Sequence, residues 1–283
     1  MLTDAFLTRL DALRLSVRGR ARGGAGGTRR SASLGSSAEF SDYREYIPGD
    51  DIRRVDWNAM ARFDKLFLKL FMEEQESAVT VLLDGSASMT EKWDMARMAA
   101  ETVGYLALTG GDRLRLIMLQ DGEPRISSVL SGRPAYARLT QFLDACVPSG
   151  KSGPKSSVLR LDGLRKGLCF LISDCYAEKE ELGEILDYLR YSRQETGVMQ
   201  VLSAFEMNPF LDGAVRLTDS ETGETVDLLA DRGVLLDYQE TLEQFLKETR
   251  AACFHREVPY LLLKGGESFE ETMIPLLVQS GII

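Results

Sequence analysis

The sequence has a single histidine, His255, and four dispersed cysteines, and it lacks any long apolar run. None of the cysteines forms the C-x-x-C pair that zinc and thioredoxin-like sites use. A single histidine excludes histidine-rich metal sites and leaves only one candidate for histidine-based acid–base catalysis. No apolar segment approaches the roughly 18 residues of a membrane span. Because Arg9 and Asp11 stand where a signal peptide has its apolar core, the sequence predicts a cytoplasmic protein.

The net charge of −9 is distributed unevenly along the chain. Residues 9–30 hold seven arginines and one acid, Asp11, so this arm carries +6 and the remainder −15. No aromatic residue interleaves these arginines and no recognition motif accompanies them, which argues against specific nucleic-acid binding. The other target suited to such an arm is anionic lipid, through a weak peripheral contact at the inner face of the membrane.

The first residues have the pattern of a short amphipathic helix followed by a glycine run at residues 23–27. Apolar side chains recur at three- and four-residue steps, at Leu2, Phe6, Leu10, Leu13 and Val17. The glycine run lacks the Lys-Ser/Thr of a phosphate-binding loop, so we interpret it as a linker. We expect the helix to dock on the acidic body, with the membrane surface as the alternative.

With 283 residues, 44% of them apolar and 27% charged, the chain is suited to one large or two modest globular domains. From residue 77 onward, short apolar runs alternate with amphipathic segments, as in parallel sheets whose strands are joined by helices. The predicted strands are 79–83, 114–119, 168–172, 198–205 and 260–263, and the predicted helices are 94–108, 134–146, 178–193, 238–253 and 269–278. An alternating stretch around Thr222-Gly223 predicts a β-hairpin inserted at about 212–228. The predicted fold class is α/β, with a doubly wound, mostly parallel sheet and an N-terminal extension.

We place the boundary of that α/β domain at residues 77–283 and assign residues 1–76 to the extension, which we expect to pack on the domain. Residues 39–72 are dense in charged and aromatic side chains, with a turn at 46–51 and a strand at 67–71. The acids and arginines between Arg44 and Asp56 are interpreted as a buried ion-pair and turn network that fixes this segment on the sheet domain, with Trp57 as an anchor of that packing.

Polar side chains follow two of the predicted buried strands, where ligands bind in open parallel sheets. Asp84, Ser86 and Ser88 alternate directly after the first strand, and Asp174 follows the central one. Alternation lets three oxygens point the same way in an extended loop, and such oxygens suit Mg²⁺ or Ca²⁺. The alternative is a purely structural role, a Gly/Ser turn in which Asp84 caps the following helix.

This arrangement resembles the metal-ion-dependent adhesion site (MIDAS) of von Willebrand factor A domains. The resemblance implies that the hydroxyls of Ser86 and Ser88 bind the cation directly and that Asp84 and Asp174 bind it directly or through water. In that family a threonine from a third loop is a further ligand of the cation. The corresponding residues 148–157 of this chain offer only serines, of which Ser152 is our candidate ligand. The implied cation is Mg²⁺, with Ca²⁺ or Mn²⁺ as alternatives, and an empty site would leave a metal-free docking surface.

A longer resemblance covers nearly the whole chain. The segments at residues 35–40, 44–57 and 61–62, together with the hairpin at 219–224, are similar to the signature of a bacterial family catalogued as domain of unknown function 58. The chain departs from that pattern at Asn58 and Phe63, where lysine and threonine are frequent. Members carry a von Willebrand A-like domain and are typically encoded beside MoxR-type AAA+ ATPases, which the resemblance implies as the partner.

We therefore expect a non-enzymatic interaction module, an adaptor that binds a MoxR-type ATPase and a client protein during maturation or assembly of complexes. One alternative is a metal-dependent phosphohydrolase that uses Asp84 and Asp174. The sequence argues against it, because it has no phosphate-cradling loop and no histidine near these residues. The other is a metal-free docking scaffold at the membrane surface.

Overall fold

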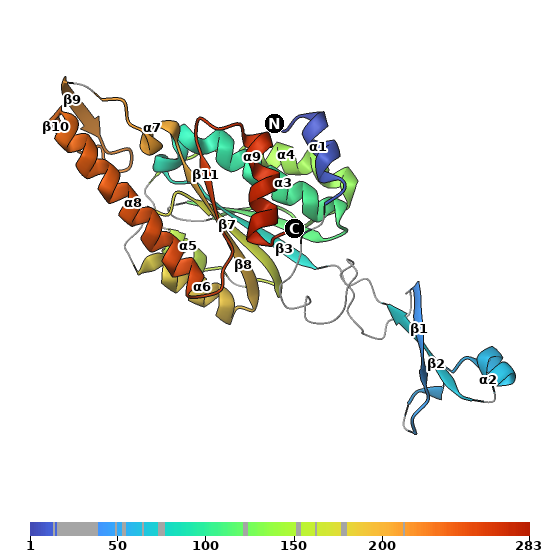
Figure 1. The fold of residues 1–283 in the computed structure, drawn as a ribbon. Helices are drawn as coiled ribbons and strands as arrows, with labels where there is room; N and C mark the ends of the chain where they lie inside the picture. Colours follow the sequence, from blue (N-terminus) through green and yellow to red (C-terminus); the bar gives the residue numbers. More distant parts are fainter. Residues whose placement is uncertain are drawn as a thin grey trace. The chain divides into compact units, whose positions relative to one another are not determined.

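The computed structural model describes residues 1–13, 15, 39–48, 50–52, 55–63, 65–72, 77–120, 124–150, 154–161, 163–176, 180–211 and 213–283 (Figure 1). Val17, the glycine run, Ser152 and all the arginines of the basic arm except Arg9 lie outside these residues. The chain divides into two compact units, one of Met1–Arg18 with Ser77–Ile283 and the other of Gly19–Glu76. The N-terminal helix thus belongs to the larger unit, and each unit is described separately below.

The larger unit is built on a seven-stranded sheet with the order β11-β8-β7-β3-β4-β5, in which β6 also pairs with β4. The strands β11, β8, β7, β3 and β4 are parallel to one another, and β5 and β6 run antiparallel to β4. The strand bounds are β3 Ala78–Asp84, β4 Arg113–Leu119, β5 Arg125–Ile126, β6 Leu130–Ser131, β7 Gly167–Ser173, β8 Gln194–Leu202 and β11 Tyr260–Lys264. The chain passes from β3 to β4 on one side and later returns to β7 on the other, so the sheet is doubly wound. This topology confirms the predicted von Willebrand A-like, Rossmann-type fold class.

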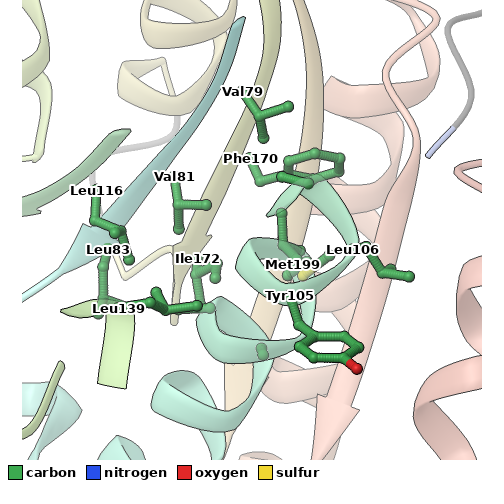
Figure 2. Close-up of a cluster of buried hydrophobic side chains, with 14 of the residues drawn as sticks. Val79, Val81, Leu83, Tyr105, Leu106, Leu116, Leu139, Phe170, Ile172 and Met199 are labelled. Atoms are coloured by element: carbon green, nitrogen blue, oxygen red, sulfur yellow. The ribbon is translucent and has the colours of Figure 1, made fainter. Parts of the chain in front are cut away.

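Helices cover both faces of the sheet, which explains why the strands are apolar throughout (Figure 1). On one face Val79, Val81 and Leu83 of β3 pack against one set of helices, as Figure 2 shows for the surrounding core. On the other face Leu82 packs against a second set. The first set comprises α1 Asp4–Leu10, α3 Trp93–Thr109, α4 Tyr136–Asp144 and α9 Phe269–Ser280; the second comprises α5 Pro154–Leu159, α6 Glu181–Tyr191 and α8 Arg232–Phe254.

The N-terminal helix α1 is docked on the body by its apolar face. Phe6 and Leu10 are buried in the core, and the ring of Phe6 lies edge-on to Phe269 of α9, with 6.2 Å between centroids. Thr3 adds polar contacts, because its backbone N–H and its hydroxyl both donate to the carboxylate of Glu270. The apolar face of α1 is therefore covered by the protein body, as expected, and is not free to lie on a membrane surface.

Short elements complete the larger unit. The 3₁₀ segments η3 Ala87–Lys92 and η4 Arg133–Ala135 precede α3 and α4, and α7 Ala204–Met207 follows β8. The hairpin consists of β9 Gly213–Thr218 and β10 Thr225–Ala230, paired antiparallel. Among the described helices, none is both long and apolar enough to cross a bilayer.

For two of the element boundaries that differ from the sequence prediction, the structure gives a local reason. The strand expected to reach residue 205 ends at Leu202, because Ser203 and Glu206 form a capping box that starts α7. Helix α8 begins at Arg232, well before the predicted residue 238, because the carboxylate of Asp231 accepts from the backbone N–H of Val234.

The smaller unit contains an antiparallel pair, β1 Glu39–Glu45 with β2 Phe67–Met72, and the helix α2 Trp57–Phe63. Asp56 caps α2 by accepting from the N–H groups of Asn58 and Ala59. Within this unit α2 buries Ala59 and leaves Trp57 61% exposed, and the packing of Trp57 on the sheet domain stays a prediction. Arg44 and Asp50 form an ion pair at the surface of this unit, and Arg53 and Arg54 lie outside the described residues. The network expected to fix this segment on the sheet domain stays a prediction.

The docked helix provides a test of the fold. We expect Phe6→Ala to lower the free energy of unfolding by about 3–5 kcal/mol, because it removes a fully buried aromatic side chain and leaves a cavity. Urea denaturation followed by circular dichroism measures the change. A loss below about 1 kcal/mol would show that α1 contributes no core packing.

Candidate functional site

The candidate site lies where the strand order of the sheet reverses. Strands β3 and β7 are neighbours, and their carboxyl ends present Asp84 and Asp174 to the same edge of the sheet. Ser86 lies in the turn after β3, and Ser88 in η3. Asp84, Ser86 and Asp174 are buried, with relative exposures of 2%, 1% and 0%, respectively. Buried carboxylates at a strand switch point need polar partners, and the surrounding turns supply them.

Four of the five predicted site residues converge through direct hydrogen bonds. The Oγ of Ser88 donates to Oδ2 of Asp174 at 2.8 Å, and the Oγ atoms of Ser86 and Ser88 are 2.9 Å apart. Asp84 accepts from the backbone N–H of Ser86 through Oδ1 and from the hydroxyl of Ser173 through Oδ2, at 3.1 and 2.6 Å. Asp84 thus contacts the turn and reaches across to β7, but it does not cap the following helix, whose N-cap residue is Ser86.

Asp174 is held by contacts from both sides. Its carbonyl accepts from Nε2 of Gln200 on β8 at 2.8 Å, and its Oδ1 accepts from the N–H of Tyr176 at 3.1 Å. Cys175 has a φ of +62°, a left-handed conformation that turns the chain sharply after Asp174. Burial raises the pKa of the Cys175 thiol well above its ordinary value, so this cysteine is an inert neighbour.

The loop expected to provide the third ligand begins beside the turn after β3. The N–H of Ser149 donates to the carbonyl of Gly85 at 2.8 Å, and the N–H of Ala87 donates to that of Gly150 at 3.1 Å. Ser149 also accepts from Nε2 of Gln120. Ser152, the predicted ligand of this loop, lies outside the described residues, so its assignment stays a prediction.

Sequence reasoning missed a lysine at the centre of the site. Nζ of Lys92, at the end of η3, lies 2.9 Å from Oδ2 of Asp174, the oxygen that also accepts from Ser88. The ammonium pairs as well with Oε1 of Glu206 on α7 and lies 4.9 Å from the centroid of the Tyr176 ring. The Lys92 side chain is only 1% exposed. The capping-box spacing of Ser203 and Glu206 was readable in the sequence, but nothing local linked Glu206 to Lys92.

The electrostatics of the site are set by burial and by the proximity of like charges. Burial, and then the negative charge of Asp174, raise the pKa of Asp84 from its ordinary value of 3.8 to about 6. The hydrogen bonds from Ser173 and Ser86 act in the opposite direction and offset part of this rise. A cation at the site would therefore relieve an unfavourable concentration of negative charge.

The donor set fits a hard divalent cation. Its atoms are the carboxylate and hydroxyl oxygens of Asp84, Ser86, Ser88 and Asp174, which is the chemistry that Mg²⁺, Mn²⁺ and Ca²⁺ prefer. Among the residues that the structure describes, no group of three or more His, Cys, Asp or Glu side chains is placed to hold a metal. A cation here would consequently depend on the serine hydroxyls. His255 takes no part, since it is an exposed residue that ends α8.

The raised pKa of Asp84 predicts a specific pH dependence in the presence of EDTA. A carboxyl whose pKa is higher in the folded state stabilises the fold fully below its unfolded value, and this contribution is lost as the pH rises through about 6. We expect the stability of the wild type relative to Asp84→Asn to fall by about 2 kcal/mol between about pH 4 and pH 7.5. Urea unfolding of both proteins across this range measures it, and a pH-independent difference would contradict the assignment.

Comparison with known proteins places the chain in a family. The model of the family described as "Protein of unknown function DUF58" matches residues 42–245. An uncharacterized protein of Mycobacterium tuberculosis strain H37Rv is 26% identical over 264 residues, covering 87% of this chain and 78% of that protein. The similar solved structures include the conserved hypothetical protein BatB of Bacteroides thetaiotaomicron (TM-score 0.40, 12% identity, 72% of this chain and 98% of that one). They also include an aerotolerance-related membrane protein of Bacteroides fragilis (TM-score 0.42, 12% identity, 73% of this chain and 100% of that one). The family match spans most of the chain, and the protein belongs to the DUF58 family.

Proposed function

We propose that this protein is a non-enzymatic interaction module that binds a partner protein through a cation held by Asp84, Ser86, Ser88 and Asp174. The convergence of these four side chains at the switch point of the sheet is the observation that carries the proposal. We keep Ser152 as the candidate ligand from the third loop. Mg²⁺ is the proposed ion, because it is the abundant hard cation of the cytoplasm, with Mn²⁺ and Ca²⁺ as substitutes.

The donor set suggests how a partner is recognised. An ion whose protein shell is incomplete keeps water, and a carboxylate from another chain can displace that water. A partner that presents an exposed aspartate or glutamate would then bind more tightly in the presence of the metal, since the metal adds to the free energy of the complex. The partner chemistry is therefore an acidic side chain on a protein surface.

The family resemblance supplies the class of partner. We propose a MoxR-type AAA+ ATPase as the energy-supplying partner and a client protein complex as the object of maturation or assembly, in the cytoplasm or at the inner face of the membrane. The docked face of α1 does not favour membrane binding by that helix, because Phe6 and Leu10 are already buried. Any contact with anionic lipid would be made by the arginines of the basic arm.

A metal-free docking scaffold is the second candidate, and a specific observation favours it. The ammonium of Lys92 already supplies one positive charge to Asp174 within the buried site. The hydrolase alternative has less support, because no histidine lies near the described part of the site and the carboxylates are engaged with serines and Lys92.

Metal dependence of partner binding tests the proposal. With the tagged full chain and a purified MoxR-type ATPase, we expect recovery of the ATPase in Mg²⁺ to fall at least about ten-fold in EDTA and in Asp84→Ala. Asp144→Ala is the matched control, since Asp144 is a half-exposed surface carboxylate paired with Arg97. Equal recovery in all four samples would contradict metal-dependent docking.

The non-enzymatic assignment has its own test. Phosphoester substrates incubated with the protein in Mg²⁺ or Mn²⁺ should show no turnover above the Asp84→Ala background. Turnover that disappears in Asp84→Ala while Asp144→Ala retains it would establish the hydrolase alternative.

A further inference from the structure

The position of Lys92 is unusual for a lysine. Lysine side chains are almost never fully buried unless they are paired, and that of Lys92 is 1% exposed. Its ammonium contacts Oδ2 of Asp174 at 2.9 Å and the carboxylate of Glu206, and it faces the ring of Tyr176. These partners surround the charged end of Lys92 with negative charge and with the electron-rich face of an aromatic ring.

The ammonium connects the ends of three adjacent strands. Lys92 itself ends η3, which follows β3; Asp174 follows β7; and Glu206 lies on α7, which follows β8. Glu206 is fixed in turn, because its Oε2 accepts from the N–H of Ser203 at 2.6 Å and its carbonyl accepts from the hydroxyl of Tyr238 at 2.8 Å. Lys92 therefore meets a preorganised carboxylate on one side and the candidate site on the other.

One oxygen is shared between Lys92 and the candidate site. Oδ2 of Asp174 accepts both from Nζ of Lys92 and from the Oγ of Ser88, one of the hydroxyls assigned to the cation. A divalent ion bound through Ser88 and Asp174 would be close to the ammonium and would draw on the same negative charge. Two cations compete for one carboxylate at short range in a buried environment, where solvent screens their repulsion poorly.

We propose that Lys92 is a built-in counter-cation of this site, which competes with the divalent metal for Asp174 and so lowers the affinity of the site for that metal. This inference rests on the proposed function in one respect, namely that the oxygens of Asp84, Ser86, Ser88 and Asp174 bind the metal. In the absence of metal, the ammonium balances the charge of Asp174. Metal binding then requires Lys92 to give up Asp174, with Glu206 available to retain the ammonium.

Direct measurement of Mn²⁺ binding to the full chain tests this inference, with free Mn²⁺ followed by electron paramagnetic resonance. We expect Lys92→Met to lower the dissociation constant at least about ten-fold relative to the wild type, because it removes a positive charge next to the ligands. Lys166→Met is the matched control, because Lys166 is exposed and directly precedes β7, at the end of that strand opposite to Asp174, and it should leave the constant unchanged. Lys92→Arg keeps the charge and should bind Mn²⁺ no more tightly than the wild type.

The outcomes separate this inference from the proposed function. If Lys92→Met and the wild type bind Mn²⁺ equally and Asp84→Ala abolishes binding, the competition is wrong and the metal site stands. If neither the wild type nor Lys92→Met binds Mn²⁺, both the competition and the metal-dependent form of the proposed function are wrong.

A second variant protects the test against a folding defect. Near-ultraviolet circular dichroism reports whether Lys92→Met keeps its tertiary structure, and Lys92→Gln provides a polar replacement that can still donate to a carboxylate. Saturating Mn²⁺ should raise the melting temperature of Lys92→Gln more than that of the wild type, since the metal replaces the missing charge. An equal or smaller rise would overturn the inference.

Discussion

Two carboxylates buried at the ends of neighbouring parallel strands dominate the chemistry of this protein. Asp84 and Asp174 are placed together because β3 and β7 flank the point where the strand order reverses. Neither side chain can reach water, so their charges must be balanced within the protein. The charges are balanced by hydrogen bonds from the hydroxyls of Ser173 and Ser88 and from the turn after β3, and by the ammonium of Lys92.

The same constraint makes the site receptive to cations. Hydrogen bonds from serines stabilise buried carboxylates only in part, and the pKa of Asp84 stays raised despite them. A positive ion relieves the remaining repulsion, and this chain offers one from its own sequence in Lys92. In our proposal, Lys92 stabilises the site when no metal is bound and, for the same reason, lowers the affinity of the site for metal.

The strand-end residues were predictable from the sequence because their signal is local. A buried apolar run followed by alternating polar residues defines Asp84, Ser86 and Ser88, and the same logic defines Asp174. Lys92 was not predictable, because its partner Glu206 is 114 residues away and only the packing of α7 beside η3 brings them together.

The central claim is that Asp84, Ser86, Ser88 and Asp174 form a cation site in which Lys92 competes with metal. The most direct test is a crystal structure of the full chain grown in Mn²⁺, with anomalous diffraction data to locate the ion. We expect an anomalous peak among these four side chains and an ammonium of Lys92 that has left Asp174 but still contacts Glu206. Crystals that diffract well, show no peak at saturating Mn²⁺ and keep Lys92 on Asp174 would contradict the claim.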